Sequence, residues 1–191
     1  MVRFEGGETM RLYRQTVEDF GLYAGLELTD GEFQKLTEAA GQMSAKMRAV
    51  RIISASGVTK RELEHRLIQK GENPTQAKEA VSWLSEMDLL DDAKTAQNIV
   101  ERCIAKGYGL ARAKQALYEK RVPKHLWEDA LEDYPVQDAH ILSYLEAHPE
   151  IREDRKARDR AVQALMRRGH SYGEIRRCME NFSVEMEETD G

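Results

Sequence analysis

The sequence predicts a mostly α-helical fold, built as an elongated array of three tandem three-helix repeats after a short N-terminal extension. Only 4 of the 191 residues are proline and 33% are charged, a composition that favours helices because straight-chain residues lose little rotamer freedom in them. From about Met43 onward, apolar residues recur every three or four positions, which is the spacing of one helix face. One helical segment also recurs along the chain, as expected of a repeat protein.

Residues 1–42 are the predicted N-terminal extension. Gly6-Gly7 lies between two short runs that contain alternating apolar residues, a pattern that favours a small β-hairpin. Further along, Thr29 is followed three residues later by Glu32. This pair is a capping box, with which we expect a helix to begin.

The first predicted repeat covers residues 43–90 and contains clear signals for helix ends. Its second helix begins with a capping box of Thr59 and Glu62 and ends at Gly71. Its third helix has Pro74 at the first helical position, where the missing N–H costs nothing. We therefore expect three helices in this unit.

The end of the second helix recurs twice more. The segments LIQKGEN, LYEKRVP and LMRRGHS align Gly71 with Arg121 and Gly169, at separations of 50 and 48 residues. Apolar positions match in the third helix of each copy: Ala80, Ala130 and Cys178; Val81, Leu131 and Met179; Leu84, Tyr134 and Phe182. We therefore predict repeats at residues 43–90, 91–134 and 135–183, followed by an acidic tail at 184–191.

None of the reactive residues forms a recognisable catalytic or metal-binding pattern. Neighbours on a helix point about 100° apart, so we expect Asp91 and Asp92 to mark a helix start rather than act as an acid–base pair. The 5 histidines lack metal-ligand spacing, and neither of the 2 cysteines belongs to a CxxC motif. Gly107-Tyr108-Gly109 lacks the Lys-Ser/Thr of a phosphate loop, so helix termination is expected there. We expect no enzyme activity, no cofactor and no metal.

Basic residues are concentrated in two parts of an acidic chain. The net charge of −5 argues against a dedicated nucleic-acid binder, yet Glu119 is the only acid between Arg102 and Lys124. One interpretation is a solvated helix face, and the other is contact with phosphate or with an acidic protein surface. The candidate partner-binding residues are Arg102, Lys106, Arg112, Lys114, Lys120, Arg121, Lys124, Arg167 and Arg168.

Three stretches resemble the RecX family of bacterial recombination regulators. They are VEDFGLYAGLELTDGEF, TKRELEHRLIQKG and LLDDAKTAQNIVERCIAKGYGLARAKQALYEKRV. The matching elements are Glu62-Leu63, Leu67 and Lys70-Gly71 in one helix, the Asp91-Asp92 junction with Ala96, the turn Gly107-Tyr108-Gly109, and Leu117 with Lys120-Arg121-Val122. The family's usual glycine in the last element is Arg121 here, which leaves that helix end without its easy left-handed residue.

The resemblance implies a non-enzymatic protein of three-helix repeats that lies along the helical groove of a RecA–DNA filament. Such a protein modulates, and usually inhibits, strand exchange and coprotease activity in DNA recombination, DNA repair and the SOS response. It implies RecA as the partner, with single-stranded DNA contacted indirectly or weakly. The sequence has no membrane span or signal peptide, so we expect a cytoplasmic monomer. A direct DNA-binding helical module and a helical-repeat scaffold for another protein stay open as alternatives.

Overall fold

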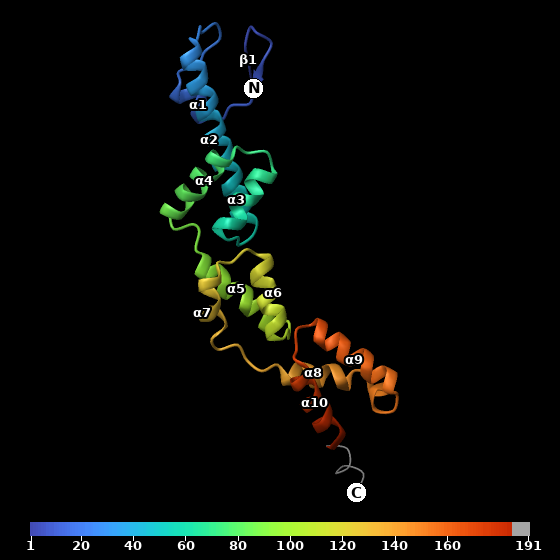
Figure 1. Cartoon of the computed structure of the whole chain (residues 1–191). Coiled ribbons are helices and arrows are strands. Elements are labelled where there is room, and N and C mark those ends of the chain that lie inside the picture. The colour runs from blue at the N-terminus through green and yellow to red at the C-terminus, as the bar shows by residue number, and fades with distance from the viewer. Residues whose placement is uncertain (185–191) are drawn as a thin grey trace. The chain divides into compact units, whose positions relative to one another are not determined.

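The computed structural model describes residues 1–184, and the chain divides after Asp91 into two compact units (Figure 1). Apart from a hairpin of two short strands, the described elements are helices. This confirms the predicted all-α class. The predicted acidic tail lies outside the described residues, except for Val184 at its start.

The N-terminal segment forms the predicted β-hairpin. Strand β1 (Val2–Arg3) pairs antiparallel with β2 (Thr9–Met10). The turn between them contains Gly7, whose φ of 84° lies in the left-handed region that suits glycine. A short helix, α1 (Arg14–Asp19), follows the hairpin.

The long helix α2 (Asp30–Ala55) runs without interruption through the predicted boundary between residues 42 and 43. It begins with the predicted capping box, in which Glu32 N–H donates to the Thr29 hydroxyl and Thr29 N–H donates to the Glu32 carboxylate. Gly41 lies in mid-helix, where a Cβ would approach the Gln76 side chain to 2.4 Å. Residues of the predicted extension and of the first predicted repeat therefore belong to one helix. Because Gly41 has no side chain, the Gln76 side chain can pack directly against this helix.

Two further helices pack on the C-terminal part of α2 (Figure 1). Helix α3 (Lys60–Gln69) begins at Thr59, whose hydroxyl accepts from Glu62 N–H, and α4 (Pro74–Glu86) begins after the Asn73 cap. Burial of the apolar stripes of the three helices stabilises this unit, because isolated helices of this length are marginal in water. The buried core contains Ala45, Ala49, Val58, Leu63, Leu67, Ala77, Ala80, Val81, Leu84 and Leu90.

The second unit begins with α5, directly after Asp91. Asp91 stands before the helix and Asp92 is its first residue, at the helix start that the sequence predicts. Ser171 and Glu174 form a reciprocal capping box at the last helix of the unit. The elements are α5 (Asp92–Ala105), α6 (Leu110–Glu119), η1 (Lys124–Leu126), α7 (Trp127–Leu131), α8 (Asp138–Glu146), η2 (Pro149–Arg152), α9 (Arg155–Arg167) and α10 (Tyr172–Val184).

The second unit contains two hydrophobic clusters, one on each side of the predicted boundary between residues 134 and 135. Trp127 packs against the first cluster and donates its indole N–H to the Val122 carbonyl at 3.0 Å. The first cluster is Ala96, Val100, Leu117 and Val122. The second is Ile141, Leu145, Ile151, Ala157, Ala161, Leu165, Ile175, Cys178 and Phe182.

The three aligned helix ends share one backbone conformation. Gly71, Arg121 and Gly169 have φ values of 89°, 54° and 92°. Arg121 therefore adopts the left-handed conformation that the sequence suggested it would avoid. A left-handed backbone costs a residue with a Cβ roughly 1–2 kcal/mol. The helix nevertheless ends with the same backbone hydrogen bond, from Val122 N–H to the Leu117 carbonyl, as at the other two ends.

Candidate functional site

Helix α5 carries the first two candidate basic residues on its solvent side. Arg102 lies in its last turn and Lys106 follows the helix end, and both side chains are exposed. Residues four apart on a helix lie on one face. Val100 and Cys103 turn inward instead and are buried.

Helix α6 divides the middle basic stretch between two faces. Arg112 and Lys114 are two residues apart, which separates their directions by about 200° around the axis. Arg112 is half-buried and donates to the Glu119 carboxylate at 3.2 Å, whereas Lys114 is exposed. Hydrogen bonds from Gln115 and Arg112 lower the pKa of Glu119 below its usual value. The nine candidates therefore do not form one continuous surface.

The other candidates of this stretch follow α6. Lys120 is exposed, Arg121 is half-buried, and Lys124 is exposed at the first position of η1. These three residues lie at the opposite end of α6 from Arg112. They therefore lie apart from the basic residues at the start of α6.

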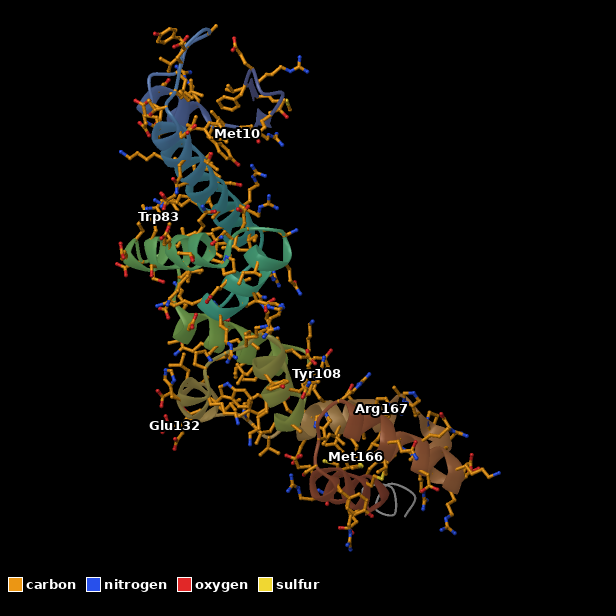
Figure 2. All side chains as sticks on the ribbon, turned by 45° about the horizontal axis from the view of Figure 1, so that its top comes forward. Met10, Trp83, Tyr108, Glu132, Met166 and Arg167 are labelled. Atoms are coloured by element: carbon orange, nitrogen blue, oxygen red, sulfur yellow. The ribbon has the colours of Figure 1, made fainter. Side chains whose placement is uncertain are left out.

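The start of α6 packs against the end of α9. This contact joins the basic stretch at residues 102–124 to a second basic stretch at residues 151–169. Gly109 N–H donates to the Arg168 carbonyl at 3.0 Å, and Ala111 N–H donates to the Gly169 carbonyl at 3.2 Å. We call this contact the junction. Tyr108 and Arg167, labelled in Figure 2, lie next to its two sides.

The junction brings the backbone of Arg112 close to the end of α9, where Arg167 and Arg168 lie. Arg112 backbone atoms and Cβ lie so close to Gly169 that a Cβ there would come within 2.3–2.9 Å of them. Arg167 and Arg168 are exposed at the end of α9. The Arg168 guanidinium lies 5.0 Å from the Tyr144 ring centroid, a cation–π contact that holds it in place.

The turn Gly107-Tyr108-Gly109 ends α5 and also packs the junction. Gly107 has a φ of 64°, the left-handed conformation expected at a helix end. A Cβ on Gly107 would lie 2.3 Å from Cγ of His140, and one on Gly109 would lie 2.1 Å from the Gly169 carbonyl oxygen. The sequence predicts the termination of the helix but not this close packing.

Two titratable groups, the half-buried Tyr134 and the buried His170, lie against the turn. The Tyr134 hydroxyl donates to the Tyr108 carbonyl at 2.6 Å, and burial raises the pKa of Tyr134 to about 12. His170 is 4% exposed, and burial lowers its pKa, opposed by Glu174 and by a backbone hydrogen bond with Gly107. Both groups are therefore neutral at physiological pH and serve packing.

The reactive side chains of the described residues do not converge on a reaction centre. Across residues 1–184, no group of three or more His, Cys, Asp or Glu is placed to hold a metal ion. Cys103 and Cys178 are buried free thiols, and burial raises the pKa of Cys178 to about 11, which disfavours the reactive thiolate. None of the helices in this range is long and apolar enough to cross a membrane.

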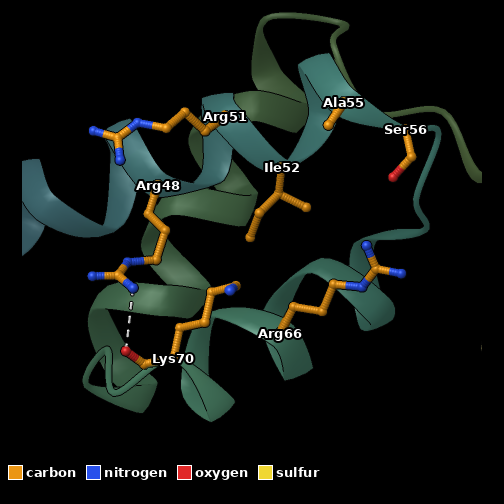
Figure 3. Close-up of a pocket in the computed structure, with 7 residues that line it drawn as sticks. All are labelled: Arg48, Arg51, Ile52, Ala55, Ser56, Arg66 and Lys70. Atoms are coloured by element: carbon orange, nitrogen blue, oxygen red, sulfur yellow. Dashed lines mark hydrogen bonds between the residues drawn. The ribbon is translucent and has the colours of Figure 1, made fainter.

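The first unit also contains a cationic pocket that the sequence did not predict (Figure 3). It has a volume of about 370 Å³ and lies between α2 and α3. On α2 its lining residues follow helical spacing, and the two from α3 and its C-terminal cap are four residues apart. This helical spacing is the feature of the sequence from which the pocket could have been predicted. The lining residues are Arg48, Arg51, Ile52, Ala55 and Ser56 on and after α2, and Arg66 and Lys70 on and after α3.

Comparisons with known proteins identify similar chains. The family model described as RecX, second three-helix domain, matches residues 91–131. The Regulatory protein RecX of Vibrio parahaemolyticus is 28% identical over 155 residues, which cover 79% of this chain and 96% of the relative. That of Streptococcus mutans is 25% identical over 189 residues, which cover 97% and 73%. The chain is therefore similar to RecX regulatory proteins over most of its length, and its residues 91–131 match the second three-helix domain of that family.

Solved RecX structures share the fold. A crystal structure of regulatory protein RecX aligns with a TM-score of 0.68 at 19% identity, over 93% of this chain and 91% of that one. RecX from Lactobacillus salivarius aligns with a TM-score of 0.65 at 22% identity, over 76% and 99%. These alignments support the helical-repeat architecture, and the names of the relatives support a regulatory role.

Proposed function

We propose that this chain binds the RecA–DNA filament and modulates RecA recombinase and coprotease activity. We expect it to inhibit both activities. The observation that carries the proposal is the junction, where Arg112 and the Arg167-Arg168 pair come from two helices distant in the sequence. Similarity to RecX regulatory proteins supports it.

The charge distribution suits a filament partner. A basic surface attracts DNA phosphate or an acidic protein surface, while the net charge of −5 limits indiscriminate binding to nucleic acid. Repeated modest contacts along a filament would add up through avidity. Single-stranded DNA is then contacted indirectly or weakly, and the chain acts as a monomer in the cytoplasm, in recombination, repair and the SOS response.

The test is co-sedimentation with RecA assembled on single-stranded DNA, combined with the rate of RecA ATP turnover. We expect the chain to sediment with the filament and to lower turnover. Reversing charge at Arg167 and Arg168 to Glu should weaken binding about tenfold, since exposed charges contribute about 0.7 kcal/mol each. No effect at a severalfold excess over RecA would overturn the proposal.

Lys78→Glu is the control for this surface, because Lys78 is an exposed lysine on α4 that lies outside the candidate partner-binding residues. It should change affinity less than about threefold. Circular dichroism should be unchanged in all variants. If duplex DNA binds without RecA and with a steep salt dependence, the direct DNA-binding module replaces our proposal. If neither DNA nor RecA binds, a scaffold for another protein replaces it.

A further inference from the structure

The pocket between α2 and α3, here called the α2–α3 pocket, carries an excess of positive charge. Its four basic side chains are Arg48, Arg51, Arg66 and Lys70. Glu72 pairs with Arg48 at 2.6 Å, and Glu62 pairs with Arg66 at 2.7 Å. Two carboxylates thus balance two of four cations, which leaves two positive charges for a ligand.

One wall of the pocket is held rigidly. The Glu72 side chain is 7% exposed and accepts hydrogen bonds from the Ser44 hydroxyl and the Arg48 guanidinium. Arg48 also donates to the Lys70 carbonyl at 3.3 Å, as the dashed line in Figure 3 marks. Arg48 therefore connects α2 to the end of α3, and a ligand would not have to order this side chain.

The opposite side of the pocket keeps donors available. Arg66 uses Nε for Glu62, so its two terminal NH₂ groups remain for a second partner. Within residues 1–184, no hydrogen bond or ion pair engages the Lys70 ammonium. In Figure 3 the Lys70 side chain extends toward Ile52, between Arg48 and Arg66.

We propose that the α2–α3 pocket binds the phosphate monoester of a nucleotide, either free or at the end of a strand. A phosphate monoester carries a charge of about −2 near pH 7, which matches the two uncompensated cations, whereas a backbone diester carries only one negative charge. Lys70 and Arg66 bind the phosphate oxygens, and Arg48 and Arg51 strengthen the positive field.

The apolar part of the lining favours a nucleotide over a bare ion. Ile52 projects into the middle of the pocket and Ala55 lies beside it (Figure 3). These side chains offer a surface for the sugar or base once the phosphate is held. The volume of about 370 Å³ falls at the lower end of small-ligand pockets. This site goes beyond the proposed function, because it needs neither RecA nor the junction.

The test measures fluorescence anisotropy of the full chain with a short labelled strand that carries, or lacks, a terminal phosphate. We expect the phosphorylated strand to bind about tenfold more tightly, since hydrogen bonds to charged groups are the strong ones. Lys70→Gln should abolish that difference, and Arg66→Gln should reduce it. Lys78→Gln is the matched control, an exposed lysine on α4 outside the pocket, and should keep the difference.

Competition identifies the source of the phosphate. If a free nucleoside monophosphate displaces the strand, the ligand is a free nucleotide, and if only phosphorylated strands compete, it is a strand end. Equal binding of the two labelled strands to the folded wild-type chain would overturn the proposal. Preference for a phosphoserine peptide over both nucleotide probes would also overturn it. The assay contains no RecA, so its failure is distinct from failure of filament binding.

Discussion

Gly109→Ala tests the junction directly. Gly109 has a φ of −75°, so alanine meets no backbone strain there, and only the lack of space opposes it. The added Cβ would lie 2.1 Å from the Gly169 carbonyl oxygen and 2.4 Å from the His170 nitrogen. Ordinary contacts begin near 3.4 Å, so these backbone segments must separate by more than 1 Å.

The expected loss follows from what that separation breaks. The hydrogen bonds from Gly109 and Ala111 to the end of α9 are worth about 1 kcal/mol each. Overpacking of a tight contact adds about 1–3 kcal/mol. We therefore expect the free energy of unfolding of the second unit to fall by about 3–5 kcal/mol, measured by urea denaturation followed by circular dichroism. Amide hydrogen exchange at Ala111 should accelerate together with this loss.

Gly173→Ala is the matched control. Gly173 lies in the first turn of α10, and a Cβ there would meet nothing within 4 Å. Alanine is the better helix former, so this variant should be unchanged or more stable by up to about 1 kcal/mol. Equal urea midpoints for Gly109→Ala and Gly173→Ala would refute the close approach of α6 and α9.

Three further changes probe the same region. Arg121→Gly should raise the free energy of unfolding by about 0.5–1 kcal/mol in urea, because relief of the left-handed backbone exceeds the entropic cost of glycine; a loss of stability would mean that the Arg121 side chain contributes more than its backbone costs. Tyr134→Phe removes the hydrogen bond to Tyr108 and should cost about 1 kcal/mol at neutral pH. Because the pKa of Tyr134 is raised to about 12, its contribution is complete below pH 10 and is lost as pH rises toward 12. An ultraviolet titration should therefore show one late tyrosine in the wild type that is missing from the variant. His170 has the opposite effect on stability, because its pKa is lowered in the folded protein. The neutral side chain stabilises the fold fully above the usual histidine pKa of 6.5, and the free energy of unfolding falls as the pH drops below that value. His170→Gln should flatten the urea midpoint between about pH 7 and pH 5, and a wild-type midpoint that is flat over that range would contradict the assignment.

The helices and their ends could be predicted because their causes are local. The Thr29 and Ser171 capping boxes need only a partner three residues away, so the sequence contains the complete signal. The aligned helix ends likewise depend on one residue each. Arg121 shows the limit of that reasoning, because it adopts the left-handed helix end although its own preferences oppose that conformation.

The candidate surface was predicted as a set of residues but not as an arrangement. Charge counting selected the basic stretches, and helix geometry then separated Lys114 from Arg112 on α6. The α2–α3 pocket was missed because Arg48 and Arg51 on one helix, and Arg66 and Lys70 by the other, do not form a dense run in the sequence. The sequence shows their helical spacing, but it does not show that the two helices pack with these residues toward each other.

The sequence by itself determined the helical class, the repeat and the basic character of particular stretches, since capping, apolar spacing and charge are properties of neighbouring residues. Tertiary structure decided which distant residues meet. Gly109 and Gly169 allow two backbones to touch, and this contact joins Arg112 to Arg168. Such contacts depend on the shape of both surfaces at once, because close packing leaves no room for even one additional Cβ.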